Sequence, residues 1–153
     1  MRMPTNLILN WYAVILGCVS CISTCVAGRT IIEKWDLTDF CYTITDEMWE
    51  RTPDWTENNE SPPMSIRSAV KKANDGLKLL QAHGMVEKIS PEDGAIWEIE
   101  HIGLKKLEGD KWFWRIEFEY KRLSGGASGV TKPAIVVVLM DGTILLHKRN
   151  GCN

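Results

Sequence analysis

The sequence contains few of the residues that usually build a catalytic centre or a nucleic-acid surface. It has only three histidines, and His83, His101 and His147 fall in separate segments without metal-ligand spacing. It also lacks a G-x-S-x-G motif and a cysteine–histidine pair at a spacing that suggests a nucleophile. The formal net charge of −2 argues against a nucleic-acid partner, because nucleic-acid-binding surfaces are usually basic. We therefore expect no enzymatic activity, no catalytic residues, no cofactor and no metal site.

Charged side chains are missing from a long segment near the N-terminus. Residues 1–6 contain one basic side chain, and residues 7–27 contain no Lys, Arg, His, Asp or Glu. With small residues at Val26-Ala27-Gly28, this pattern predicts a secretory signal peptide that is cut after Ala27 or Gly28. Two alternatives are an uncleaved anchor, since about 20 apolar residues span a bilayer, and a lipoprotein signal, since Ile15-Leu16-Gly17-Cys18 resembles a lipobox. Each assigns residues 1–28 to targeting and places the rest in the periplasm or outside the cell, with membrane contact only through this segment.

The predicted export determines how the cysteines are interpreted. Cys18, Cys21 and Cys25 lie in the targeting segment, so the mature chain keeps only Cys41 and Cys152. Two cysteines in an oxidising compartment usually pair, which predicts a Cys41–Cys152 disulfide. The alternative is two free buried thiols.

Residues 111–121 show the clearest strand pattern. Large apolar side chains recur at every second position, namely Trp112, Trp114, Ile116, Phe118 and Tyr120. Charged side chains fill most positions between them, namely Arg115, Glu117, Glu119 and Lys121. The pattern predicts a β-strand with one buried and one solvated face. We expect the two glutamates to be solvated and not an acid/base pair, because Arg115 and Lys121 flank them.

The pattern of apolar residues over residues 65–83 predicts the main helix. Ile66, Val70, Ala73, Leu77 and Leu80 form one apolar stripe. Gly84 fits a C-terminal cap. We expect the stripe to cover the aromatic face of the strand above.

Two further hairpins are predicted. Residues 97–107 turn at 108–110 into the aromatic strand, with His101 as a core histidine and a bulge at Gly103 that corrects the phase. Asp141-Gly142 joins two apolar runs as a tight turn. In the register of a two-residue turn, Val136, Val138, Leu145 and His147 form a second face, the candidate interaction face. We expect the tryptophan-rich lead-in before the helix or a second copy of the chain to cover this apolar face.

The segment before the helix is acidic and rich in tryptophan. Between residues 28 and 60 there are nine acidic and only three basic side chains. We expect residues 29–64 to be a solvated lead-in and linker, with a short helix capped by Thr45 and tryptophans that pin the segment to the core. The strands and helix together predict an α+β domain over residues 65–153, with one main helix on an antiparallel sheet of about four strands.

The order of helix and strands resembles the PepSY-type and cystatin-like small exported domains over residues 65–149. The resemblance rests on Ala69 and Ala73, on Trp114-Arg115-Ile116, and on the run from Val136 to Gly142. It implies a non-enzymatic domain that binds a protein or peptide, such as a peptidase that it would restrain. The alternative is a small enzyme or ligand-binding domain with a pocket between helix and sheet, lined by Trp112, Trp114 and His101. A filled interior would favour the first interpretation, and a wide polar cavity the second. A homodimer is compatible with either.

We predict that mass spectrometry of the protein from its native compartment, without reduction, finds the Cys41 and Cys152 peptides linked. On the chain-entropy model, closing a loop of about 100 residues contributes up to ~4.7 kcal/mol of stability. Two alkylatable thiols in the same sample would contradict both the bridge and the predicted export.

Overall fold

The computed structural model describes residues 28–35, 38–89, 94–122 and 133–147. Apart from Gly28, the predicted targeting segment lies outside these residues, and so does Cys152. In the described part of the chain, neither helix has the length and apolar character needed to cross a membrane. The elements in chain order are β1 (Gly28–Trp35), β2 (Thr38–Thr45), α1 (Asp46–Arg51), α2 (Ile66–Ala82), β3 (Ala95–Lys106), β4 (Trp112–Arg122), β5 (Ala134–Leu139) and β6 (Ile144–Leu145).

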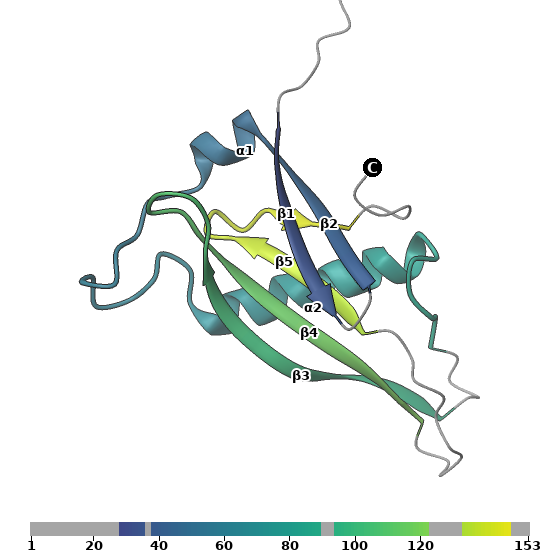
Figure 1. The fold of residues 1–153 in the computed structure, drawn as a ribbon. Coiled ribbons are helices and arrows are strands. Elements are labelled where there is room, and N and C mark those ends of the chain that lie inside the picture. Colours follow the sequence, from purple (N-terminus) through teal and green to yellow (C-terminus); the bar gives the residue numbers. More distant parts are fainter. Residues whose placement is uncertain (1–27, 36–37, 90–93, 123–132, 148–153) are drawn as a thin grey trace, which may run out of the picture.

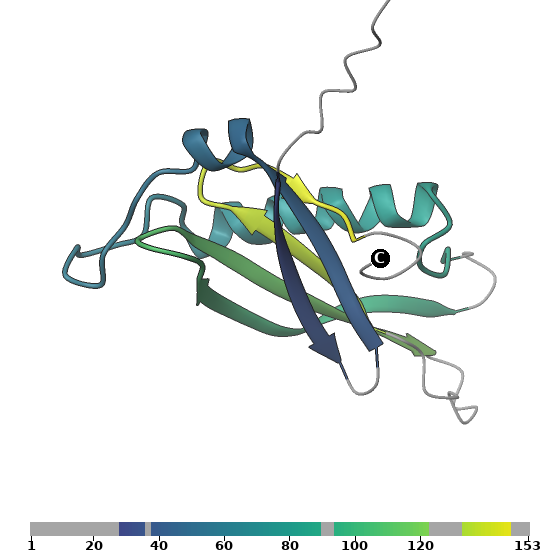
Figure 2. The same ribbon diagram turned by 45° about the horizontal axis from the view of Figure 1, so that its top comes forward.

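The architecture is α+β in three layers (Figures 1 and 2). The central layer is an antiparallel four-stranded sheet in the order β3-β4-β5-β6, and β1 and β2 form a separate antiparallel hairpin. Helix α2 covers one face of the central sheet, and the β1–β2 hairpin crosses the other. The predicted class and the single main helix agree with the structure.

Helix α2 begins and ends where its local sequence predicts. The Ser65 hydroxyl accepts a hydrogen bond from the backbone N–H of Ser68 at 3.2 Å, so Ser65 is the N-cap. The helix ends before Gly84, whose φ of +64° is an unstrained conformation only for glycine. Its buried side is made of small and apolar residues, namely Ala69, Ala73, Gly76, Leu77 and Leu80. Ile66, expected in the stripe, is the first residue of the helix and is half exposed.

Strand β4 places its aromatic row against α2, as predicted. The five side chains from Trp112 to Tyr120 that share this face are each at most 8% exposed. Their neighbour β3 pairs with β4 in one antiparallel ladder, but the irregularity lies between Ile99 and His101 and not at Gly103. The extra residue reverses the phase of β3 at His101, so His101 stands opposite Glu117 and is exposed. The prediction of a core histidine was therefore wrong.

The β5–β6 turn has one more residue than the sequence suggested. The N–H of Leu139 bonds to the carbonyl of Thr143 at 2.9 Å, which closes a loop that includes Met140 as well as Asp141 and Gly142. Three-residue hairpin loops of this kind need a left-handed residue, and Gly142 supplies it with a φ of +90°. The longer loop pairs Val138 with Ile144 and shifts the strand register by one residue.

This shift divides the candidate interaction face between two layers. Val136 and Val138 are fully buried under α2, whereas Leu145 is 3% exposed and packs under the hairpin. These residues therefore form no common exposed surface.

The acidic lead-in is the missing cover of the sheet. The inward side chains of the β1–β2 hairpin pack on the apolar side chains of the sheet face opposite α2. The hairpin contributes Ile31, Phe40, Tyr42 and Ile44, and the sheet contributes Phe113, Ile135, Val137, Leu139 and Leu145. The lead-in, which was one of the two expected covers, therefore covers this face of the sheet. Residues 28–45 are therefore part of the folded domain, and not a solvated segment in front of it.

We predict that Gly76→Ala lowers the free energy of unfolding by about 1–3 kcal/mol through overpacking. A Cβ at this position would lie 2.7 Å from Cγ1 of Val136 and 2.9 Å from Cγ2 of Ile144. Alanine is otherwise the better helix residue, by up to about 1 kcal/mol. Denaturant unfolding measures the change, with Lys71→Ala on the exposed side of α2 as control. A variant as stable as the control would show that helix and sheet are loosely packed.

Candidate functional site

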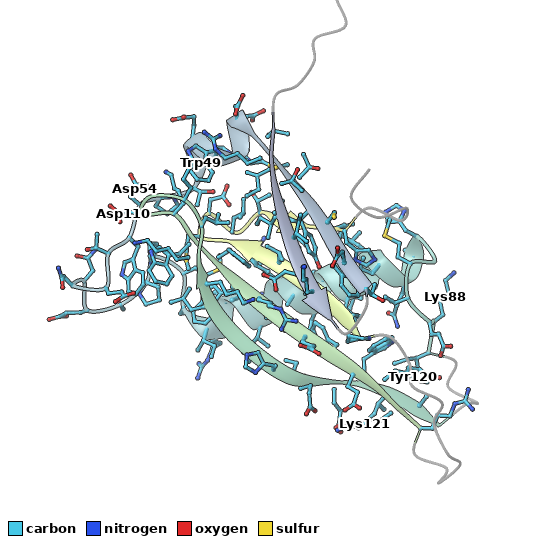
Figure 3. All side chains as sticks on the ribbon, in the orientation of Figure 1. Trp49, Asp54, Lys88, Asp110, Tyr120 and Lys121 are labelled. Atoms are coloured by element: carbon cyan, nitrogen blue, oxygen red, sulfur yellow. The ribbon has the colours of Figure 1, made fainter. Side chains whose placement is uncertain are left out.

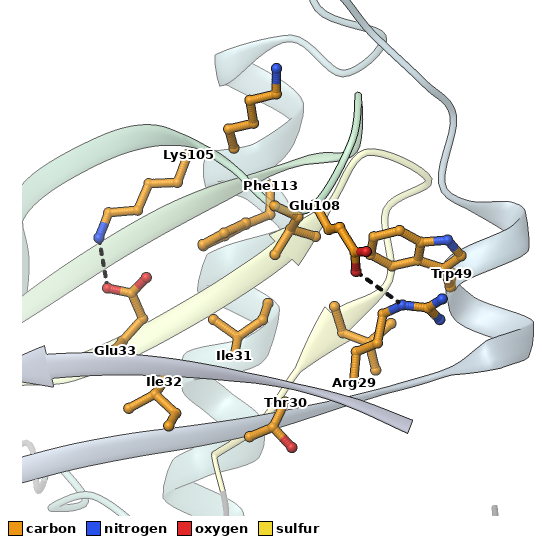
Figure 4. A pocket seen from close by; sticks show the side chains of 12 residues that line it. Arg29, Thr30, Ile31, Ile32, Glu33, Trp49, Lys105, Glu108 and Phe113 are labelled. Carbon is orange, nitrogen blue, oxygen red and sulfur yellow. Dashed lines mark hydrogen bonds and ion pairs between the residues drawn. The ribbon is translucent and has the colours of Figure 1, made fainter. Parts of the chain in front are cut away.

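A groove of about 350 Å³ opens beside strand β1 (Figure 4). We call it the β1 groove. One wall is β1 itself, from Arg29 to Glu33, and the opposite wall is the end of β3 with the turn that follows it. Trp49 of helix α1 stands at one end. The groove thus lies at the open side of the molecule, where the hairpin layer passes over the edge of the central sheet.

Strand β1 presents an unpaired backbone edge. It pairs with β2 on one side without any break in register over its eight residues, and in the described part of the chain no strand pairs with its other side. Alternate N–H and C=O groups of an edge strand point away from its partner and are open to another strand. The two edges of the central sheet are less suited to strand addition, because β3 carries the irregularity at Ile99–His101 and β6 has only two residues.

The floor of the groove is apolar. Ile31 and Phe113 lie in the packed layer between hairpin and sheet, at 8% and 2% exposure, and Leu107 packs against them. On the outer side of β1, Ile32 is 51% exposed, and among the described bulky apolar side chains only Ile66 is as exposed. An extended segment beside β1 would therefore find apolar contacts on both faces.

Ion pairs border the groove at both ends (Figure 4). At one end, Nζ of Lys105 lies 2.8 Å from Oε2 of Glu33. At the other end, Nε of Arg29 lies 3.7 Å from Oε2 of Glu108, and the Arg29 guanidinium also stacks on the Trp49 ring, 4.0 Å from its centroid. The apolar floor lies between these two charged ends.

Beneath the hairpin, Glu33 belongs to a buried ionic cluster. Nε of Arg115 donates to Oε2 of Glu33 at 2.8 Å, and Nη1 of Arg115 donates to Oε2 of Glu117 at 2.7 Å. The three side chains are 8%, 6% and 16% exposed. The prediction that Arg115 and Glu117 lie on a solvated face was wrong, because the hairpin covers this part of the sheet. Glu119 and Lys121 lie beyond the hairpin and stay exposed, and hydrogen bonds to Glu98 and Glu119 raise the pKa of Lys121.

The buried polar groups near this cluster are structural. The hydroxyl of Tyr42 donates to the carbonyl of Ile135 at 2.8 Å, and burial raises the pKa of Tyr42 far above its ordinary value. The ring of His147 packs edge-on against Phe40 and Tyr42, and burial lowers the pKa of His147. His147 thus fills the hairpin layer and is not part of an exposed interaction face.

The residues of the alternative pocket are not brought together. Trp112 and Trp114 lie under α2, where Nε1 of Trp114 donates to the carbonyl of Met64 at 3.0 Å. His101 is on the surface of β3. Among the described residues, no three side chains of His, Cys, Asp or Glu are grouped as a metal site would require. Cys41 is almost fully buried in β2, and its predicted partner Cys152 lies outside the described residues, so the disulfide stays a prediction.

Sequence reasoning missed the β1 groove because it missed the hairpin. A signal was available, since Phe40, Tyr42 and Ile44 alternate with smaller residues and Thr30-Ile31-Ile32 is a run with high β-propensity. The high density of acidic residues around these segments concealed it.

Comparison with known proteins adds no relative: no family model matches the chain, and no curated protein or solved structure matches it significantly. The resemblance to PepSY-type and cystatin-like domains therefore stays a prediction, and the function has to be argued from the groove itself.

We predict that Arg115→Ala lowers the free energy of unfolding by about 3–5 kcal/mol, because removal of one partner leaves a buried charge without compensation. The control is Lys121→Ala, an exposed lysine that also bonds to glutamates, for which we expect a much smaller change because solvent-exposed ion pairs contribute little to stability. Denaturant unfolding compares the two variants. Equal and small effects would mean that Glu33 and Glu117 are solvated after all.

Proposed function

We propose that this protein is a non-enzymatic, exported binding module that engages an extended segment of a protein or peptide along strand β1. The observation that carries the proposal is the unpaired edge of β1 above an apolar groove. When a segment adds to a sheet edge, main-chain hydrogen bonds provide affinity and side-chain pockets provide specificity. Strand β1 offers the first, and the groove beside it the second.

The alternative is a small enzyme or ligand-binding domain with a pocket between helix and sheet. The packing of that layer favours the binding module. The aromatic row of β4 is buried there, and Gly76 approaches the sheet so closely that even a methyl group would collide with Val136. The histidine expected to line the pocket lies outside this layer.

The proposals about export and about the class of partner rest on the sequence alone. The predicted targeting segment would put the domain and its partner on the outer side of the cytoplasmic membrane. A peptidase is the partner that the resemblance to PepSY-type and cystatin-like domains implies. The β1 groove is compatible with a peptidase, and equally with any other protein that presents an extended segment.

The test is selection of a random peptide library on the purified protein. We expect it to enrich peptides that bind Ile32→Glu at least about tenfold more weakly than wild type, because the added strand would lie beside this side chain. The control is Leu79→Glu, which changes a comparably exposed side chain on α2, at 43% against 51%. Failure to enrich any peptide, or enriched peptides that bind both variants and the wild type equally, would refute the proposal.

A further inference from the structure

We infer that the β1 groove selects extended segments in which an apolar residue stands between two acidic residues at alternating positions, that is, acidic-x-apolar-x-acidic. This inference rests on the proposed function, since it specifies the segment that would add to β1. It follows from three properties of the groove: the spacing of the side chains on β1, the apolar centre, and the charges that reach solvent at the rim.

The spacing comes from β1 itself. Ile31 and Glu33 are buried toward the central sheet, whereas Thr30, Ile32 and Lys34 are exposed. Arg29 shares the inward phase and lies along the groove. A strand beside β1 has the same period of two residues, with a rise of about 3.3 Å per residue. Its inward side chains would therefore stand beside positions 29, 31 and 33.

The central position is apolar. A side chain beside Ile31 would lie over the floor formed by Phe113 and Leu107. A polar side chain here would lose water without a hydrogen-bonding partner, which is unfavourable. The middle residue of the segment is therefore valine, isoleucine, leucine or a similar side chain.

The two outer positions meet cations. Among the charged side chains that line the groove, Arg29, Lys105 and Lys106 are 42%, 46% and 51% exposed. Glu33 is only 6% exposed, and the buried Arg115 already compensates its charge. Glu108 is the one exposed acid of this lining, at 82%. The charge that a bound segment meets is thus mainly positive, with Arg29 at one end and Lys105 at the other.

The present partners of Arg29 do not prevent this recognition. Arg29 contacts Asp46 and Glu108 through solvent-exposed pairs, which contribute little to stability. A carboxylate on an added strand would approach the same guanidinium while the strand excludes water, so its attraction is screened less. A lysine or arginine at either outer position would instead be repelled.

A second copy of the chain fits the groove less well. On its inward face, β1 offers Arg29, Ile31 and Glu33, that is, basic-apolar-acidic. Paired antiparallel with β1 of another copy, it would place that copy's Arg29 at the Lys105 end and that copy's Glu33 beside Arg29. This Glu33 is already bound to Arg115 and Lys105 of its own chain, so only the arginine would bring an uncompensated charge into the groove. Charge complementarity therefore favours a separate acidic segment over self-association.

The test compares three acetylated peptides, Thr-Glu-Thr-Val-Thr-Glu-Thr and its counterparts with glutamine or lysine in place of both glutamates. Binding is measured by NMR titration of the purified protein at low and at high salt. We expect the glutamate peptide to bind at least about tenfold more tightly than the lysine peptide, and the difference to shrink at high salt because exposed charges are screened. In strand addition only every second N–H group of the peptide bonds to β1. N-methylation of the odd-numbered or of the even-numbered residues should therefore abolish binding in one of the two sets and not in the other.

Lys105→Gln should remove most of the preference for glutamate. The matched control is Lys121→Gln, because Lys121 is similarly exposed and also pairs with glutamates but lies at the other end of the sheet from Trp49 (Figure 3). Circular dichroism and denaturant unfolding establish that both variants are folded, and Arg115 still compensates Glu33 when Lys105 is changed. A preference lost in both variants, or kept in both, would overturn the inference.

The remaining outcomes separate the inference from the proposed function. Equal binding of the three peptides would overturn the charge pattern and leave strand addition in place. Binding of library-selected peptides without binding of the glutamate peptide would do the same. A dimer in sedimentation that Ile32→Glu converts to monomer would make a second copy the occupant and overturn the inference. If neither the designed nor the library peptides bind, the proposed function itself fails.

Discussion

The ion pair between Arg115 and Glu33 is the interaction on which the arrangement of the two sheets depends. It joins the centre of β4 to β1 across 82 positions of sequence, in a layer that consists mainly of apolar side chains. A buried charge is tolerated only when its partner is in place. A slip of the hairpin by one residue would turn Glu33 to solvent and Ile32 to the core, and would remove one of the two carboxylates that bond to Arg115. The pair therefore favours one register of the hairpin on the sheet, and this register fixes where the edge of β1 lies.

The features predicted correctly are those that neighbouring residues determine. The start of the helix near Ser65, its end at Gly84 and the aromatic row of β4 depend on contacts within a few residues or on a regular period. The errors concern features that depend on a single inserted residue, and residues whose partners are distant in the sequence. The extra residue before His101 and the longer β5–β6 loop each reverse a phase, and the sequence pattern is nearly the same with or without them.

The charged face of β4 shows why distant partners are hard to predict. Arg115 and Glu117 alternate with aromatic residues, as in a strand with one face in water, and this pattern predicted exposure. Glu33, which makes burial of Arg115 tolerable, lies in a segment whose many acids suggested a solvated lead-in. Two segments that each resemble a surface thus cover one another. The groove was missed for the same reason, since it exists only where the hairpin crosses the sheet.

The burial of both faces of β5, at the middle of the central sheet, limits the surface that a partner could use. All six residues of β5 are buried, and the hairpin occupies the apolar face that might otherwise have bound another protein. The surface that remains is an edge, whose main-chain groups accept almost any extended sequence that lacks proline. Selectivity must then come from the few side chains that border the groove. Because the floor is apolar and the exposed rim is mostly basic, electrostatics, and not shape alone, would decide which extended segment is retained.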